Sequence, residues 1–267
     1  MRKGMKIGFI GCGNMATAMI NGVLGSRLAE REDIMASAAT EQTREKIRQK
    51  LMIGCGSNEE VASFGDIVVL AVKPLYYQEV CAAIAPCLRS EQVVVSLAPG
   101  KSLDYLAGML GEDRKIVRAM PNTPALVGEG MSGLCASVSV TGQEAAIVEK
   151  LFESFGKAQW VPEHLMDVVT AVSGSSPAYI FLVIEAMADG AVALGMPRAQ
   201  AYQFAAQAVL GSAKMVLESG EHPGLLKDAV CSPGGTTIEA VRILEQKGIR
   251  SAFMEAEIAC AKKAGDM

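Results

Sequence analysis

Short apolar runs separated by amphipathic stretches fill the first part of the chain. The five clearest runs are residues 5–10, 33–38, 66–72, 92–98 and 115–120. Uninterrupted apolar runs are typical of strands buried on both faces of a parallel sheet. Because helical patterns lie between most of them, the pattern predicts an α/β, doubly wound sheet. Further strands are predicted at 131–137 and 159–161, and the helix between them begins with the capping-box residues Thr141 and Glu144.

The pattern changes near residue 163, where strand-like runs stop. We therefore assign residues 1–163 to the sheet domain and residues 164–267 to an all-helical domain. The helices predicted there are 165–194 with an interruption at 173–177, then 198–218, a short run before 231, 236–246 and 249–263. Residues 179–184 are apolar in succession, and a helix that is apolar all round has to be buried. A domain of this size can hardly bury it alone, so we expect a homo-oligomer formed through the helices.

Composition excludes several classes of function. Half of the 267 residues are hydrophobic, 20% are charged and the net charge is −4. No long basic cluster is present, which argues against nucleic acid or an anionic membrane as the main partner. The most apolar stretch carries Glu185 and Asp189 in its middle, which disfavours a membrane span. The N-terminus leads directly into a strand and not into a signal-peptide core.

The seven cysteines show no paired spacing, so we interpret them as reduced thiols in a cytoplasmic protein. The two histidines and the cysteines do not form a pair with the spacing of metal ligands. No metal site is therefore expected.

A glycine motif follows the first strand and precedes a helix. Gly11 permits the tight turn, Gly13 lets a pyrophosphate approach the backbone, and Ala16 lets the helix pack closely on the strand. This context predicts a dinucleotide site. The contacts expected in the motif are Ile10, Gly11, Cys12, Gly13, Asn14 and Met15.

The end of the second strand bears on the choice between NADP and NAD. Enzymes that prefer NAD usually carry an acid there, but the first acid in this chain is Glu41, inside the next helix. Ser37 and Thr40 are candidate donors to a 2′-phosphate, and Arg44 is a candidate counter-charge. NADP is therefore favoured, with NAD left possible. Asn58 is predicted to cap the helix that it begins, with a second role near the adenosine.

A turn near the C-terminus is a candidate anion site. Ser232 is followed by Pro233, Gly234 and Gly235, and a helix then restarts at Thr236, which has capping-box spacing to Glu239. The free N–H groups and the helix dipole both favour an anion, with the Ser232, Thr236 and Thr237 hydroxyls beside it. The alternative is an ordinary linker between two helices.

Three parts of the sequence resemble the pyrroline-5-carboxylate reductase family, over nearly the whole chain. They are residues 7–16, residues 71–74 with 120–124, and residues 172–179 with 227–237. The resemblance implies hydride transfer from NAD(P)H to the C=N carbon of 1-pyrroline-5-carboxylate, giving L-proline. It also implies a Rossmann domain, an all-helical dimerisation domain with the active site between the two, and dimers that assemble further.

The resemblance also implies roles for individual residues. Ser232 and the N–H groups of Gly234, Gly235 and Thr236 would hold the substrate carboxylate, and Thr237 would hydrogen-bond the ring nitrogen. Glu163 would lie near the bound amino acid, or else be an exposed carboxylate at the domain boundary. The family positions near the nicotinamide and ribose are Ala71, Val72, Lys73, Pro74, Ala98 and Asn122. A protonated imine is already electrophilic, so Ser232 and Thr237 are the catalytic candidates without a strong general base.

Some positions depart from the family pattern. Ala229 replaces a polar amide, Ala38 replaces a serine near the 2′-phosphate, and Ser176 replaces a glycine. Cys12 and Cys231 lie beside the motifs, and we interpret both as packing residues.

Two other functions fit parts of this pattern. A β-hydroxyacid dehydrogenase needs a lysine on its first long helix, and residues 173–189 contain none. A non-catalytic NADP-sensing module would bind cofactor without needing Ser232 and Thr237 at an anion-binding turn.

Overall fold

The computed structural model describes residues 4–266, which separate into two compact units. The first unit comprises the chain up to Ser175 together with the C-terminal residues from Cys260 onward. The second unit comprises Ser176–Ala259. The helical segment that begins at Glu163 therefore starts inside the first unit.

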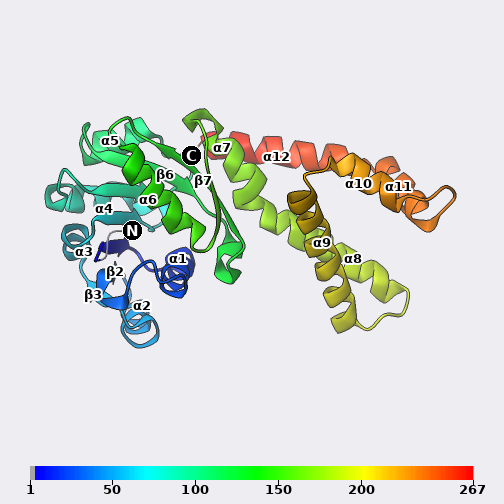
Figure 1. Ribbon diagram of the computed structural model, residues 1–267, viewed down its shortest axis with the longest axis horizontal. Coiled ribbons are helices and arrows are strands. Elements are labelled where there is room, and N and C mark those ends of the chain that lie inside the picture. Colours follow the sequence, from blue (N-terminus) through cyan, green and yellow to red (C-terminus); the bar gives the residue numbers. More distant parts are fainter. Residues whose placement is uncertain (1–3, 267) are drawn as a thin grey trace. The chain divides into compact units, whose positions relative to one another are not determined.

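Within residues 4–266, eight strands form one sheet in the first unit, in the order β3-β2-β1-β4-β5-β6-β7-β8 (Figure 1). The strands are β1 Ile7–Ile10, β2 Ile34–Ser37, β3 Gly54–Gly56, β4 Ile67–Leu70, β5 Val93–Ser96, β6 Lys115–Met120, β7 Gly130–Ala136 and β8 Gly156–Trp160. Neighbouring strands are parallel except β6 and β7, which are antiparallel. The strand order reverses between β1 and β4, and ligands of such sheets bind at the carboxyl ends of the strands beside this point.

Helices cover both faces of the sheet, which confirms the doubly wound prediction. They are α1 Asn14–Gly25, α2 Glu41–Lys46, α3 Asn58–Phe64, α4 Tyr77–Ile84, α5 Leu103–Leu110, α6 Gly142–Glu153 and α7 Met166–Val169. One hydrophobic core packs α1 and α6 on the sheet through residues such as Ile20 and Phe152. The other packs α3, α4 and α5 through residues such as Val61, Tyr77 and Leu106.

Two helix starts test the capping predictions. Thr141 and Glu144 form the predicted capping box, with each side chain bonded to the other residue's backbone N–H. The prediction for Asn58 was wrong, because Ser57 caps α3 and pairs with Glu60 in a second capping box. Asn58 is instead the first residue of the helix, which leaves its amide free for another contact.

The break predicted at residues 173–177 does not occur. Residues 163–193 stay helical, passing through a 3-10 turn, α7, a π-helical stretch Thr170–Ser175 and then α8 Ser176–Ala193. Gly174 fits against the sheet, because a Cβ there would lie 2.6 Å from Met120 Cε. The Asn122 side chain also donates to the Ser173 carbonyl at 2.9 Å. Ser173 and Gly174 therefore let the helix pass close to Met120 and Asn122 without ending there.

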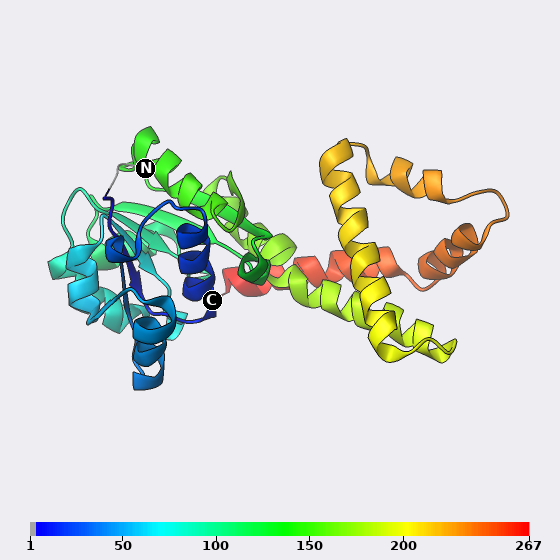
Figure 2. The same cartoon turned by 60° about the horizontal axis from the view of Figure 1, so that its bottom comes forward.

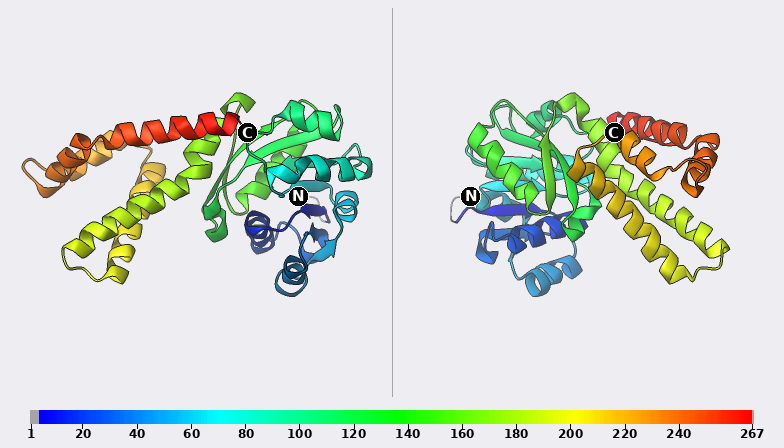
Figure 3. Two further views of the ribbon diagram at one scale, coloured as in Figure 1. Left: turned by 180° about the vertical axis from the view of Figure 1, so that it is seen from behind. Right: turned by 45° about the vertical axis from the view of Figure 1, so that its right-hand side comes forward.

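The second unit is helical throughout, as predicted. Its further helices are α9 Arg198–Ser219, α10 Pro223–Val230, α11 Thr236–Gln246 and the start of α12 Ile249–Gly265. The long helices α8 and α9 pack together as a hairpin that turns at Gly195, with φ +97° (Figure 3). The buried hydrophobic residues of this unit are alanines, Ala188, Ala201 and Ala205.

Large apolar side chains of the second unit are exposed in the single chain. They include Phe181, Leu182, Phe204, Leu210, Leu217, Leu244 and Ile258. The helical stretch Glu163–Ala193 is long and apolar enough to cross a membrane by length and composition alone, although Glu185 and Asp189 interrupt it. Asp189 forms an ion pair with Arg198 at the start of α9.

Two glycines of α1 give a matched test of how closely α1 packs against Ser154 and Phe155, which lie between α6 and β8. A Cβ at Gly22 would lie 2.7 Å from Phe155 Cβ and 2.9 Å from the Ser154 carbonyl oxygen, whereas a Cβ at Gly25 meets nothing within 4 Å. Gly22→Ala is expected to lower Tm by roughly 2–8 °C through overpacking. Gly25→Ala should leave Tm unchanged or raise it slightly, because alanine is the better helix former. Thermal unfolding of both variants measures this, and equal Tm values would contradict the close helix contact.

Candidate active site

The glycine loop forms the predicted tight turn and an open helix start. Gly11 has φ +90°, and a Cβ there would lie 2.8 Å from Val72 Cγ1 and 3.0 Å from the Ala71 carbonyl oxygen. Gly13 is the N-cap of α1 and has open space around its Cα. No side chain caps this helix, so the N–H groups of residues 14–16 face the loop without helical acceptors. The arrangement suits an anion that approaches the backbone closely.

Ser37 has a different role from the predicted one. Its Oγ accepts a hydrogen bond from Gly11 N at 3.1 Å and donates to Asn58 Oδ1 at 2.6 Å. The residue is 3% exposed, and its single hydroxyl proton is engaged. Ser37 therefore fixes the glycine loop and Asn58 in place and does not offer a donor to a phosphate.

A cavity of about 440 Å³ lies beside this loop. It is lined by Gly11, Ser37, Ala38, Ala39, Arg44, Gly56, Ser57, Asn58, Glu59, Val72, Tyr76, Glu79 and Val80. Arg44 is the cation among them, and its Nε donates to the Ala38 carbonyl at 2.9 Å. Glu41 does not line the cavity, and a hydrogen bond from Arg48 lowers the pKa of its carboxyl. The end of β2 is therefore free of an acidic side chain, as the sequence indicated.

Two residues of the glycine motif can contact a cofactor only through their backbone. Ile10 is fully buried and Cys12 is 4% exposed. Burial raises the pKa of the Cys12 thiol above its ordinary value, so the thiol stays protonated at neutral pH. Cys12 is therefore held as a packing residue. By contrast, Asn14 and Lys73 are exposed.

The carboxyl ends of β5 and β6 are held by internal hydrogen bonds. Ala98 is 6% exposed, and its N–H donates to Ser96 Oγ at 3.4 Å. Asn122 accepts a hydrogen bond from Met131 N at 2.9 Å through Oδ1 and donates to the Ser173 carbonyl through Nδ2. Its side chain thus ties β7 to the helical segment. The cofactor contacts implied for Ala71, Pro74, Ala98 and Asn122 stay predictions.

Glu163 lies in a small polar cluster that the sequence analysis missed. Its Oε1 accepts hydrogen bonds from Leu103 N and from Arg118 Nη1, each at 2.7 Å. The Glu163 side chain is 36% exposed, so its carboxylate is partly solvent-accessible as well as hydrogen-bonded, and its place near the bound amino acid stays a prediction. The one sequence signal was an arginine within an apolar strand, Arg118 in β6.

The turn before α11 lies in the stretch of chain that joins α10 to α11, drawn in orange in Figure 2. The Gly235 N–H donates to the Ser232 carbonyl at 3.0 Å, and Gly234 has φ +67°. Pro233 and Gly234 occupy the central positions of this turn, which suit the two residues. The predicted capping box at Thr236 does not form, because Gly235 is the N-cap and no side chain caps the helix. Glu239 instead binds Arg242 at 2.7 and 2.8 Å.

This geometry moves the free donors from the predicted residues 234–236 to residues 236–238. Because the turn uses the Gly235 N–H, the groups without helical acceptors are the N–H groups of residues 236–238. Ser232 and Thr236 are exposed, while Thr237 is half-buried. The turn therefore presents several backbone donors beside the hydroxyl-bearing residues Ser232, Thr236 and Thr237, and the anion site expected there stays a prediction.

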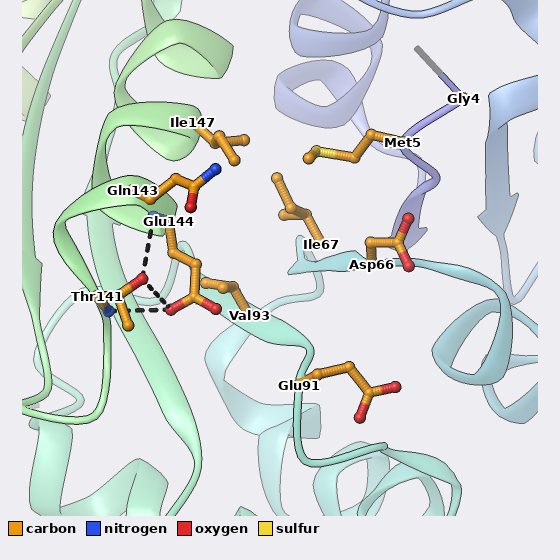
Figure 4. A pocket seen from close by; sticks show the side chains of 10 residues that line it. All are labelled: Gly4, Met5, Asp66, Ile67, Glu91, Val93, Thr141, Gln143, Glu144 and Ile147. Carbon is orange, nitrogen blue, oxygen red and sulfur yellow. Dashed lines mark hydrogen bonds between the residues drawn. The ribbon is translucent and has the colours of Figure 1, made fainter. Parts of the chain in front are cut away.

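Figure 4 shows another cavity, of about 410 Å³, at the amino ends of the strands, where Met5 precedes β1 and Val93 begins β5. Its carboxylates are already paired. Asp66 and Glu91 bind Arg89, and Glu144 binds Lys115. This cavity therefore offers no free charge, and it lies at the opposite sheet edge from the glycine loop. Among residues 4–266, no group of three or more His, Cys, Asp or Glu side chains is placed to hold a metal.

Comparisons with known proteins agree with these features. Residues 163–267 match the family model for pyrroline-5-carboxylate reductase dimerisation, and residues 6–100 match the model for NADP oxidoreductase, coenzyme F420-dependent. The chain is 52% identical over 259 residues to pyrroline-5-carboxylate reductase of Escherichia coli (strain K12), which covers 97% of this chain and 96% of that protein.

Solved structures give the same result. The pyrroline carboxylate reductase of Plasmodium falciparum with NADP bound has a TM-score of 0.90 and 33% identity, covering 98% of this chain and 97% of that one. The pyrroline-5-carboxylate reductase of Coxiella burnetii has a TM-score of 0.92 and 34% identity, covering 99% of this chain and 98% of that one. With such similarity along almost its whole length, the chain belongs to the pyrroline-5-carboxylate reductase family.

Proposed function

We propose that this protein reduces 1-pyrroline-5-carboxylate to L-proline with NADPH, in the last step of proline biosynthesis. The turn at residues 232–237 carries the proposal, because it presents free backbone donors beside the half-buried Thr237 hydroxyl. The substrate has the matching groups, one carboxylate and one ring nitrogen a short distance apart. Residues 173–189 contain no lysine, so the acid–base group of a β-hydroxyacid dehydrogenase is missing.

The first unit fits a dinucleotide. The open N-terminus of α1 and the space at Gly13 suit a pyrophosphate, and the cavity that Ser37 and Asn58 line suits the adenosine half. When bound, the nicotinamide supplies the hydride. The chain's own residues would hold the cofactor by the free backbone N–H groups of residues 14–16.

The second unit binds and orients the imine. The N–H groups of residues 236–238 and the Ser232 hydroxyl hold the carboxylate, where the dipole of α11 favours negative charge. Thr237 Oγ1 accepts the N–H of the protonated ring nitrogen. Since hydride addition to this iminium gives a neutral amine directly, no side chain has to remove a proton. The residues act mainly by orienting the C=N carbon.

Support for NADP over NAD comes from the adenosine end. The segment that follows β2 is Ala38 and Ala39, and Arg44 lines the same cavity. A guanidinium binds a phosphate through paired, charge-assisted hydrogen bonds. Glu59 also lines the cavity and provides an acceptor for a ribose hydroxyl, so NADH remains a usable but weaker donor.

We also propose that the protein works as a homodimer through its helical unit, with further assembly of dimers, in the cytoplasm. The exposed apolar side chains of α8, α9 and α11 support association, since a soluble monomer rarely exposes so much apolar surface. Burial raises the pKa of the Cys81 and Cys135 thiols to about 11, which fits unreactive reduced cysteines. Neither nucleic acid nor a membrane is proposed as a partner, given the net charge of −4.

Turnover of pyrroline-5-carboxylate tests the proposal directly. Purified protein with NADPH and this substrate should lose absorbance at 340 nm and form proline, and NADH should support a slower reaction. Protein that binds NADPH but leaves the substrate unchanged would instead indicate the cofactor-sensing alternative.

The Thr237 hydroxyl can be removed with little change of volume. Thr237→Val is expected to lower kcat by about two orders of magnitude, since one hydrogen bond to the reacting group is lost, while the Kd for NADPH stays unchanged. Ser212→Ala is the control, because it removes an exposed hydroxyl of α9 that bonds only the Ala208 carbonyl. Steady-state kinetics compares the two, and a Thr237→Val enzyme with normal kcat would remove Thr237 from the mechanism.

Arg44 decides the cofactor preference in this proposal. Arg44→Gln is expected to raise the Kd for NADPH about 10-fold and to change the Kd for NADH less than about 2-fold, because only NADPH carries the 2′-phosphate. Arg48→Gln is the matched control, since Arg48 lies on the neighbouring turn, binds Glu41 and does not line the cavity. Calorimetric titration gives both constants, and equal losses for the two cofactors would show that Arg44 does not read the phosphate.

A further inference from the structure

Arg118 is a buried cation whose position depends on one carboxylate. The residue is 7% exposed in β6, and its Nη1 lies 2.7 Å from Glu163 Oε1. Within the described part of the chain, its buried Nε has no hydrogen-bond partner. A buried guanidinium that loses its carboxylate is left uncompensated, at a large cost in stability. The pair therefore fixes where the Glu163 carboxylate lies.

The same carboxylate holds the start of α5. Glu163 Oε1 accepts the Leu103 N–H at 2.7 Å, and Leu103 is the first residue of that helix. The positive end of the helix dipole favours a carboxylate there. Ser102 supplies the ordinary side-chain cap, accepting from Tyr105 N at 3.0 Å. Glu163 thus adds a second attachment that links α5 to β6.

The segment between β5 and α5, residues 97–102, is consequently held at both ends. At its start, the Ala98 N–H donates to Ser96 Oγ, which donates to Tyr77 Oη at 3.1 Å. Tyr77 in turn donates to the Leu70 carbonyl at 2.9 Å. At its end, the Leu103 N–H is held by the Arg118–Glu163 pair. Ser96 and Arg118 are direct neighbours across β5 and β6.

The place of this segment in the sheet indicates what it does. The cavity beside the glycine loop lies at the ends of β1, β2 and β3 and reaches Val72 and Tyr76, which follow β4. A dinucleotide whose adenosine half occupies this cavity continues along the carboxyl ends of the strands across the reversal in strand order, so its second half lies towards β5. Residues 97–102 follow β5, so they border the nicotinamide half of the crevice.

We propose that Arg118 and Glu163 are positioning residues that hold segment 97–102 where it supports the nicotinamide half of the cofactor. The inference rests on the proposed NADPH-dependent reduction. A buried ion pair is often replaceable by apolar side chains without loss of stability, so stability alone does not require this one. Its distinctive contribution is a carboxylate fixed at the Leu103 N–H, which an apolar pair cannot provide.

The double variant Arg118→Met/Glu163→Leu tests this with two probes. NADPH carries the nicotinamide, whereas 2′-phospho-ADP-ribose lacks it and keeps the adenosine half. The Kd for NADPH is expected to rise about 10-fold, with an unchanged Kd for 2′-phospho-ADP-ribose, and kcat should fall at least about 10-fold. Glu163→Gln keeps an acceptor for Leu103 and should recover most of the lost NADPH affinity. Arg118→Met alone leaves no buried, unpaired charge, because the Glu163 side chain is 36% exposed. This variant is measured in the same way, so the test does not depend on the double variant folding.

A second ion pair on the same strand gives the control. Lys115 and Glu144 pair at 2.6 Å at the other end of β6, remote from segment 97–102. Lys115→Met/Glu144→Leu should leave the affinities for both probes unchanged. Two results would overturn the positioning role. One is an equal loss of affinity for both probes in the Arg118/Glu163 variants. The other is wild-type kcat and wild-type NADPH affinity in a double variant whose Tm equals that of the wild type.

The test also separates a direct ligand role for Glu163. A substrate contact predicts a raised KM for pyrroline-5-carboxylate with an unchanged Kd for NADPH, and that result would overturn the positioning role. If the wild-type protein binds NADPH but does not turn over pyrroline-5-carboxylate, the proposed function fails. The comparison of NADPH with 2′-phospho-ADP-ribose still decides the positioning role in that case, because it needs no turnover.

Discussion

Backbone N–H groups at two uncapped helix starts are the constraint on which the proposed chemistry depends. Three helices of the first unit, α3, α5 and α6, begin with a serine or threonine that uses these groups, namely Ser57, Ser102 and Thr141. The helices α1 and α11 have glycine at this position, Gly13 and Gly235, and no side-chain cap. A capping side chain would compete with an anionic ligand for the same donors. The glycines thus leave one helix start open in each unit, one suited to a pyrophosphate and the other to a carboxylate.

Because the first N–H groups of these two helices make no hydrogen bond within the helix, the loop before each helix has to be held in place by other hydrogen bonds. Ser37 does this in the first unit, because its hydroxyl takes the Gly11 N–H and gives its proton to Asn58. In the second unit the turn holds itself, through the Gly235 N–H and the Ser232 carbonyl. In both units, one backbone N–H of the loop forms a hydrogen bond that fixes the shape of the loop, and the N–H groups that follow along the chain stay available to a ligand.

The sequence was sufficient for features whose causes are local. Apolar runs identified seven of the strands, and the glycine motif, the Thr141 capping box and the turn before α11 were located correctly. It was not sufficient where the partner is distant or where two local signals compete. β3 is three residues of Gly-Cys-Gly without an apolar pattern, and Ser57 precedes Asn58 as an equally good cap. The contacts from Glu163 to Leu103 and Arg118 span 60 and 45 residues, so no local pattern could reveal them.

The two units differ in how they are stabilised, and this bears on the substrate site. The first unit has large buried side chains on both sheet faces, including Phe9, Tyr77 and Phe152. The second unit buries alanines in the single chain and leaves residues such as Phe181 and Phe204 exposed. Its helices therefore lack a core that could fix them without a partner, since burial of apolar area is the main stabilising contribution. The turn at 232–237 is carried by these helices, so the proposed carboxylate site depends on the proposed association of copies, whereas the glycine loop is complete within one chain.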